Sequence, residues 1–96
     1  MKAAVIGAGA WGTALATVLC GNGHDTTLWF RSEEKAEEAR STGINPRLKG
    51  VPLPKELHIT SDPRCVRGCA LVVIAAPSYP IRSVCQKVAP YLDADT

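Results

Sequence analysis

The sequence is poor in aromatic residues and nearly balanced in charge, and both features limit its partners. Aromatic residues make up 5% of the 96 positions, too few for a platform on which nucleic-acid bases stack. Eleven Lys and Arg against nine Asp and Glu leave a formal net charge of +2, so neither nucleic acid nor an anionic membrane is expected as the main partner. Hydrophobic residues make up 46% and charged residues 21%, which is typical of a small globular domain and excludes a disordered chain.

Residues 3–20 contain no charged side chain, and in this respect the segment resembles a signal peptide or a membrane-spanning helix. Three glycines, Gly7, Gly9 and Gly12, argue against one continuous helix there, because an interior glycine costs about 1 kcal/mol relative to alanine. A strand that ends near Ile6 and a helix that begins near Ala10 explain the same residues better. We therefore expect no leader, no membrane insertion and a cytoplasmic location.

The cysteines show neither a disulfide framework nor a zinc pattern. Only Cys65 and Cys69 lie close together, and no second pair or nearby histidine completes a set of four ligands. All four cysteines are therefore predicted to be reduced packing residues, and no metal site is expected. The sequence holds Cys20, Cys65, Cys69 and Cys85.

Strand and helix patterns alternate along the chain, which predicts an α/β fold with a Rossmann-type, doubly wound parallel sheet. Apolar runs and β-formers indicate strands at residues 2–6, 25–30, 57–60 and 70–76. Helical patterns cover residues 10–20, 33–41, 63–67 and the segment from Ser78 to about residue 89. Three prolines and two glycines make residues 42–54 a loop.

Two of these segments carry more specific expectations. In the first helix Trp11, Ala14, Leu15 and Val18 recur at i, i+3, i+4 and i+7, so they share the apolar face of an amphipathic helix. The run Leu71–Ile74 has no polar face and is expected to be covered above and below and paired at both sides. A sheet that stops after the fourth βα unit would leave this strand with an open edge. Residues 1–96 are therefore interpreted as the N-terminal portion of a dinucleotide-binding domain in a longer protein.

A glycine-rich loop follows the first strand directly and opens the first helix, the context that a dinucleotide-binding G-x-G-x-x-G motif requires. Gly7 permits the tight turn, Gly9 lets the backbone approach a pyrophosphate, and Gly12 lets the helix pack on the sheet. The start of the helix then offers free N–H groups and partial positive charge to the phosphates. The alternative is that the glycines serve only a tight turn between the strand and the helix and that no ligand binds there. The loop reads Gly7-Ala8-Gly9-Ala10-Trp11-Gly12.

The end of the second strand bears on the choice between NAD and NADP. Arg31 lies 19 residues after Gly12 and Ser32 lies 20 after it, where a carboxylate would bind the ribose 2′-hydroxyl of NAD. An arginine offers a forked donor to a 2′-phosphate, and Ser32 adds a hydroxyl, so NADP is favoured. Two alternatives stay open: Arg31 is merely solvated while Ser32 only caps the next helix, or Glu33 or Glu34 reaches the ribose and NAD binds.

Pro77 and Ser78 follow the fourth predicted strand, beside the switch point of such a sheet, where ligands bind. Ser78 therefore either faces the cofactor or caps the helix that follows. The sequence leaves both interpretations open.

Together these segments resemble the start of NAD(P)-dependent glycerol-3-phosphate dehydrogenases, and the resemblance covers essentially the whole chain. Trp11 inside the glycine loop is its most specific feature. The matching segments are residues 7–16, Asn22-Gly23-His24, Leu28-Trp29, Asn45-Pro46-Arg47, Leu53-Pro54 and Ala76-Pro77-Ser78.

The resemblance implies an oxidoreductase of phospholipid precursor synthesis that reduces dihydroxyacetone phosphate to sn-glycerol 3-phosphate with NADH or NADPH. It implies cofactor contacts from the glycine loop, including Trp11, and from Arg31 at the adenosine end. It places the substrate-binding and catalytic residues in a later, helical domain outside this chain, and it allows a homodimer. The loop after Asn45 lacks the family's usual aromatic residue, which puts a role for Arg47 in doubt. Ketopantoate reductases, 3-hydroxyacid dehydrogenases and a non-catalytic nucleotide-binding module are the alternatives.

Overall fold

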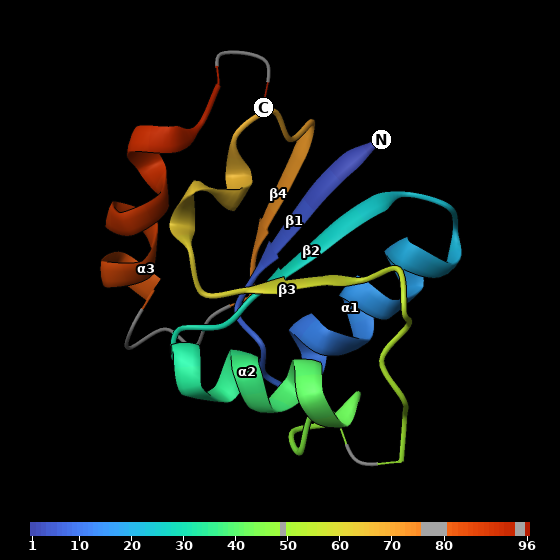
Figure 1. Cartoon of the computed structure of the whole chain (residues 1–96). Coiled ribbons are helices and arrows are strands. Elements are labelled where there is room, and N and C mark those ends of the chain that lie inside the picture. Colours follow the sequence, from blue (N-terminus) through green and yellow to red (C-terminus); the bar gives the residue numbers. More distant parts are fainter. Residues whose placement is uncertain (49, 76–80, 94–95) are drawn as a thin grey trace.

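The computed structural model describes residues 1–48, 50–75, 81–93 and 96, and it has a parallel sheet with helices on both faces (Figure 1). The strands are β1 (Lys2–Ile6), β2 (Asp25–Trp29), β3 (His58–Thr60) and β4 (Leu71–Ile74). The helices are α1 (Ala10–Gly21), α2 (Glu33–Thr42) and α3 (Ile81–Val88), with 3₁₀ turns η1 (Pro63–Val66) and η2 (Ala89–Tyr91).

The strand order is β3-β2-β1-β4, with each neighbouring pair parallel. The chain therefore moves outward from β1 to β3 and then crosses to the other side of β1 for β4. Helices α1 and α2 cover one face of the sheet, and α3 and η1 cover the other (Figure 1). This reversal confirms the predicted doubly wound fold and puts its switch point between β1 and β4.

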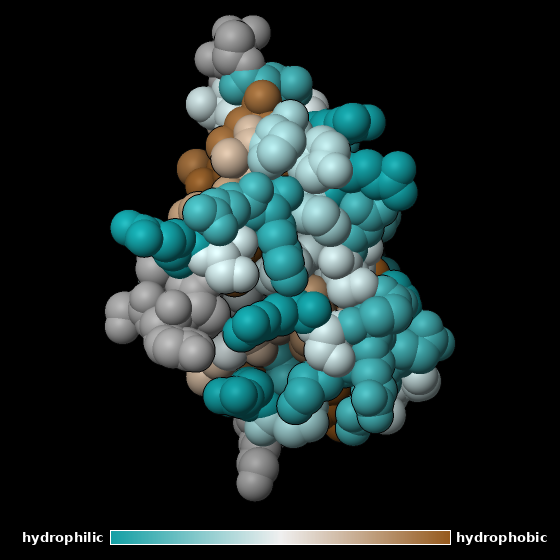
Figure 2. Space-filling view, turned by 90° about the vertical axis from the view of Figure 1, so that its left-hand side faces the viewer, coloured by the Kyte–Doolittle hydropathy of each residue, from teal (hydrophilic) through white to brown (hydrophobic). Residues whose placement is uncertain are grey.

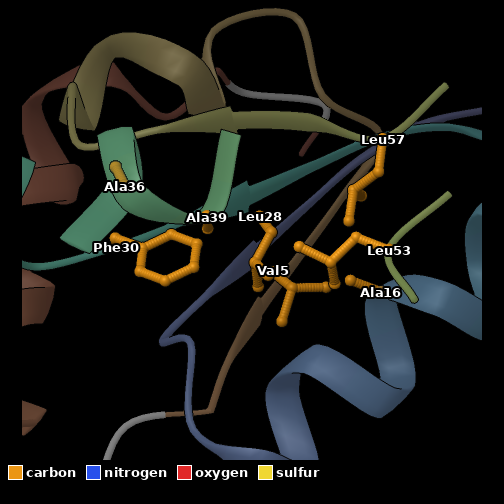
Figure 3. Packing of buried hydrophobic residues seen from close by; sticks show 8 residues of the cluster. All are labelled: Val5, Ala16, Leu28, Phe30, Ala36, Ala39, Leu53 and Leu57. Atoms are coloured by element: carbon orange, nitrogen blue, oxygen red, sulfur yellow. The ribbon is translucent and has the colours of Figure 1, made fainter. Parts of the chain in front are cut away.

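One layer of the core lies between the sheet and helices α1 and α2. Val5 and Leu28 face each other in the parallel register of β1 and β2, and both are fully buried. Phe30 continues the row beneath the small residues Ala36 and Ala39 of α2 (Figure 3). Because only methyl groups separate α2 from the sheet, this helix packs close to the strands although most of its side chains are charged.

The alternate residues of the same strands form the second layer. Ile6 and Trp29 pack under Val84 of α3 and Val66 of η1. The surface above this layer, which carries α3 and η1, is mostly hydrophilic with smaller apolar areas (Figure 2). Burial on both faces explains why β1 is a continuous apolar run without alternation.

The predicted face of the first helix is wrong in part. Trp11 is 64% exposed and Val18 58% exposed, whereas Gly12, Thr13 and Ala16 are the residues that α1 buries. At Gly12 the helix lies too close to the Gly7 carbonyl to admit a Cβ, so small residues form its most buried face. Leu15 and Leu19 also pack against the core, but they are only partly buried. An apolar period alone does not distinguish a face that packs from one that stays exposed.

The other boundaries agree with expectation to within a few residues where the structure describes them, with two differences. The segment after Ser61 forms a 3₁₀ turn rather than an α-helix, and the predicted last helix ends as α3 followed by η2. Strand β4 is at the edge of the sheet and pairs, among the described residues, only with β1, and Leu71 is 37% exposed. This is the open edge that the sequence predicted.

The cysteines match the prediction except at one position. All four are free thiols, and burial raises the pKa of Cys65 to about 11 and also raises that of the buried Cys69. Cys85 is exposed, so its predicted packing role is wrong: it lies on a face of α3 that turns away from the sheet. Across the described ranges no cluster of metal-binding side chains occurs. Within the same ranges, no helix has the length and apolar character needed to cross a membrane.

Candidate functional site

A cleft of about 570 Å³ opens at the carboxyl end of the sheet, beside the switch point between β1 and β4. Its walls come from segments that are far apart in the sequence, because the carboxyl ends of parallel strands meet at one edge. They comprise Gly7, Ala8 and Gly9 after β1; Trp29, Phe30, Arg31 and Ser32 after β2; Lys35 and Glu38 of α2; Asn45, Pro46 and Arg47 of the next loop; Ala75 after β4; and Val84 of α3.

The glycine loop forms the floor of this cleft, and two of its glycines are required by the protein itself. Gly7 has a φ of 123°, a conformation that other residues rarely adopt, and its N–H donates to the carbonyl of Trp29 at 3.2 Å. A Cβ on Gly12 would lie 2.0 Å from the carbonyl oxygen of Gly7 and 3.1 Å from the Cβ of Ala75. Gly12 therefore allows the predicted close packing of α1 against the sheet.

Gly9 differs from both, since nothing in the described protein requires a glycine there. Its φ of −73° and ψ of −175° suit any residue, and a Cβ added to it would meet no atom within 4 Å. The residue lines the cleft, so that Cβ would occupy part of the open volume. The space above Gly9 is the feature that a closely approaching ligand would use.

The start of α1 supplies hydrogen-bond donors at the same place. The first intrahelical bond runs from the N–H of Thr13 to the carbonyl of Gly9 at 3.0 Å, so the preceding amides have no partner within the helix. Gly9 offers no side-chain cap, and no acidic residue lies in the first turn of α1. Free amides and an uncompensated helix dipole make this end of the helix attractive to an anion.

The other predicted loop residues lie around this floor rather than in the cleft wall. Ala10 and the side chain of Trp11 are exposed, and Gly12 is buried beneath Gly7. Pro77 and Ser78 lie outside the described residues. The predicted contacts of these positions with a cofactor stay predictions.

Arg31 and Ser32 both line the cleft, at the end where β2 leads into α2. The Oγ of Ser32 accepts a long hydrogen bond of 3.4 Å from the N–H of Lys35, so it caps α2 as one of the two interpretations expected. A cap that is this weakly bound leaves the hydroxyl free to accept or donate elsewhere. The two roles of Ser32 are therefore compatible.

Glu33, one of the two carboxylates that could have favoured NAD, is engaged elsewhere. Its carboxylate accepts hydrogen bonds from the hydroxyl of Ser61 and from the guanidinium of Arg40, at 2.7 Å for the latter. These two donors, the hydroxyl first, lower the pKa of Glu33. Neither Glu33 nor Glu34 belongs to the lining of the cleft.

The charge of the cleft is mostly positive. Arg31, Lys35 and Arg47 line it against one carboxylate, Glu38. None of the three cations forms an ion pair with another described side chain. Lys35 was missed by the sequence analysis because a lysine near the start of a polar helix carries no signal of its own. Arg47, whose role was in doubt, lies in the cleft wall.

Asn45 is a second residue whose role the sequence did not show. It is 2% exposed, and its Nδ2 donates to the carbonyl of Ala8 at 2.9 Å and to the Oγ1 of Thr13 at 2.7 Å. Its Oδ1 accepts from the N–H of Arg47 at 3.1 Å. One buried amide thus joins the glycine loop, α1 and the loop that carries Arg47. The sequence marked Asn45 only as part of a family motif.

Comparison with known proteins agrees with this geometry. Residues 2–96 match the family model described as the N-terminus of NAD-dependent glycerol-3-phosphate dehydrogenase. A glycerol-3-phosphate dehydrogenase [NAD(P)+] of Oceanobacillus iheyensis is 43% identical over 99% of the chain, and one of Streptomyces avermitilis is 44% identical over all of it.

Two solved structures share the fold of this chain. The crystal structure of glycerol-3-phosphate dehydrogenase from Coxiella burnetii superposes with a TM-score of 0.87, at 32% identity, over 99% of this chain and 30% of that one. A PanE/ApbA family ketopantoate reductase from Ralstonia eutropha gives 0.82 at 27% identity, over 100% of this chain and 32% of that one.

The chain spans 28% of the length of the Oceanobacillus relative and 29% of the Streptomyces one. Those relatives are NAD(P)-dependent oxidoreductases by name, and the matched part of the family is its N-terminus. The glycine loop, the strand order and the sequence match therefore lead to one assignment. The chain belongs to the NAD-dependent glycerol-3-phosphate dehydrogenase family, of which it represents the N-terminal part.

Proposed function

We propose that the cleft binds a nicotinamide dinucleotide, with the pyrophosphate above Gly9 and against the first amides of α1. The observation that carries this proposal is the free space at Gly9. Nothing in the described protein requires a glycine there, whereas the close approach of a diphosphate would require one. The free amides at the start of α1 and the positive charge of the cleft support it, since both favour phosphate.

NADP is the favoured form of the cofactor. Arg31 and Lys35 lie at the adenosine end of the proposed site, and Glu33, the carboxylate that follows Ser32, is held by Arg40 and Ser61. A guanidinium and an ammonium stabilise a 2′-phosphate, whereas the ribose 2′-hydroxyl of NAD is usually bound by a carboxylate, and Glu38 is the one carboxylate among the described lining residues. We expect NADPH to bind more tightly than NADH for this reason.

We further propose that the chain serves as the cofactor-binding part of a longer enzyme that reduces dihydroxyacetone phosphate to sn-glycerol 3-phosphate. When bound, the nicotinamide supplies the hydride for this reduction. The residues of this chain bind and orient: the glycine loop holds the diphosphate, and Arg31 and Lys35 hold the adenosine end. No residue of this chain is assigned a proton transfer. All four cysteines are free thiols, which supports the proposal of a reducing, cytoplasmic compartment.

The preference for NADP is tested by Arg31→Ala, with Arg64→Ala as the matched control. Arg64 is an exposed arginine outside the cleft, paired with Asp62 at 2.8 Å. Because a charge-assisted hydrogen bond contributes about 1.5–3 kcal/mol, Arg31→Ala is expected to weaken NADPH binding about tenfold or more and NADH binding little. Isothermal titration calorimetry with both nucleotides measures this. Equal losses of affinity for the two nucleotides would show that Arg31 does not bind the 2′-phosphate.

The reaction itself is tested on the complete dehydrogenase that we propose contains this chain. Oxidation of NADPH is followed at saturating dihydroxyacetone phosphate and, separately, at saturating ketopantoate. Turnover of dihydroxyacetone phosphate alone is the expected result. Turnover of ketopantoate alone would assign the protein to the structurally similar reductases instead.

A further inference from the structure

The buried amide of Asn45 joins three parts of the site that are far apart in the sequence. It contacts Ala8, 37 positions away, and Thr13, 32 positions away, and it holds the N–H of Arg47 within its own loop. Asn45 and Thr13 are 2% and 0% exposed, so water does not compete for these hydrogen bonds.

The orientation of this amide follows from its partners. The carbonyl of Ala8 can only accept a hydrogen bond and the N–H of Arg47 can only donate one, so the NH₂ group must face Ala8 and the oxygen must face Arg47. Aspartate, which has no N–H, would place a carboxylate oxygen against the Ala8 carbonyl. Among residues of this size, only asparagine satisfies both sides.

The contact with Ala8 also fixes the next amide. The peptide bond between Ala8 and Gly9 is trans, so its C=O and N–H point in opposite directions. When the Ala8 carbonyl is held by Asn45, the Gly9 N–H is turned away from Asn45. The second contact, with Thr13, holds the first turn of α1 in register, since the N–H of Thr13 bonds to the Gly9 carbonyl.

We propose that Asn45 is a positioning residue that sets the glycine loop for diphosphate binding and fixes the loop of Arg47 as the opposite wall of the cleft. This inference rests on the proposed dinucleotide binding. It assigns Asn45 no contact with the cofactor: the residue acts through the Gly9 amide and through the main chain of Arg47. Because the diphosphate is common to NADH and NADPH, Asn45 affects the two nucleotides equally, unlike Arg31.

The experiment compares Asn45→Ala with wild type by titration with NADPH and with NADH. Loss of the amide frees a buried carbonyl and the loop, and we expect both dissociation constants to rise about tenfold with their ratio unchanged. Thr13→Val removes one acceptor of the amide and is expected to weaken the binding of NADPH and NADH equally. Thr13→Ser keeps the hydroxyl and is expected to bind both nucleotides as tightly as wild type.

Thr26→Val is the matched control, because it removes another buried hydroxyl, which donates to the His24 carbonyl at 3.0 Å at the opposite end of the sheet. It is expected to change stability without changing either dissociation constant. Wild-type affinity in a folded Asn45→Ala chain would overturn the inference, and so would a change of the NADPH-to-NADH ratio. If Asn45→Ala does not fold, wild-type affinity in Thr13→Val overturns it equally. A folded wild-type chain that binds neither nucleotide would contradict the proposed function itself.

Discussion

Gly9 and Gly12 belong to the same motif, yet their replacement by alanine is expected to change the stability of the fold in different ways. At Gly9 the backbone angles suit alanine, and the new methyl group meets no atom of the described residues within 4 Å. By restricting the unfolded chain, Gly9→Ala is expected to leave stability unchanged or to raise it by about 0.4–1 kcal/mol. The same methyl group occupies the space that we assign to the diphosphate, so binding of NADPH and NADH should fall about tenfold or more.

At Gly12 the methyl group would lie 2.0 Å from the carbonyl oxygen of Gly7, so α1 must move away from β1. Overpacking of this kind costs about 3 kcal/mol. For a domain of this size that corresponds to a loss of roughly 10–20 °C in melting temperature. Gly12→Ala thus destabilises the fold and lowers binding as a consequence.

Thermal unfolding followed by circular dichroism, together with nucleotide titration at a temperature where every variant is folded, separates the two effects. The expected pattern is a stable Gly9→Ala chain that binds both nucleotides about tenfold or more weakly, and a Gly12→Ala chain of reduced stability. Wild-type affinity in Gly9→Ala would refute the reasoning, because it would show that the diphosphate does not occupy the space above Gly9.

Three further predictions follow from the described contacts. Cys85 is exposed and should be alkylated by iodoacetamide at pH 8, whereas the half-buried Cys65, whose pKa burial raises to about 11, should react much more slowly until the chain unfolds. Because the thiol of Cys65 ionises more readily in the unfolded chain, the free energy of unfolding should fall as pH rises from 9.0 to about 11. Ser32→Ala should lower the unfolding free energy by about 0.5 kcal/mol in urea titration, the low end for a cap because its hydrogen bond is long. Arg40→Gln should raise the pKa of Glu33 in an NMR titration, but only in part, because its hydroxyl donor remains; an unchanged pKa would mean that the pair is not formed in solution.

The order of strands and helices could be predicted because glycines and prolines occur in this sequence where helices and strands end. Gly23, with a φ of 86°, follows α1, and Gly43, with a φ of 70°, ends α2. The apolar runs of β1 and β4 indicated strands covered on both faces, which is how a doubly wound sheet buries its centre. Local chemistry was sufficient for these features.

The packed face of α1 could not be predicted in the same way. The apolar period selected Trp11 and Val18, which are exposed, and also Leu15, which packs partly buried against the core. The most buried face of α1 is made of small residues instead, because there is no room for a Cβ at Gly12. Which face of a helix packs depends on how closely its neighbour approaches, and this is a property of the whole fold. The exposed Cys85 on α3 is an error of the same origin.

Of the residues that line the cleft, the sequence pointed to the start of the glycine loop, Arg31 and Ser32, but not to Lys35 or to the contacts of Asn45. The loop has a local signal because its glycines must have particular conformations and spacing. Asn45 acts through partners 32 and 37 positions away, and nothing in its neighbourhood indicates them. A residue whose role is to hold another segment becomes visible only when the two segments are brought together.

The most direct measurement of the central claim is a titration of the isotope-labelled chain with NADPH, followed through its backbone amide resonances. The account predicts saturable shifts at Gly7, Gly9 and the first amides of α1, with the strand β3 and turn η1 unaffected. Resonances of the glycine loop that stay unchanged up to saturating nucleotide, in a chain that is folded, would contradict it.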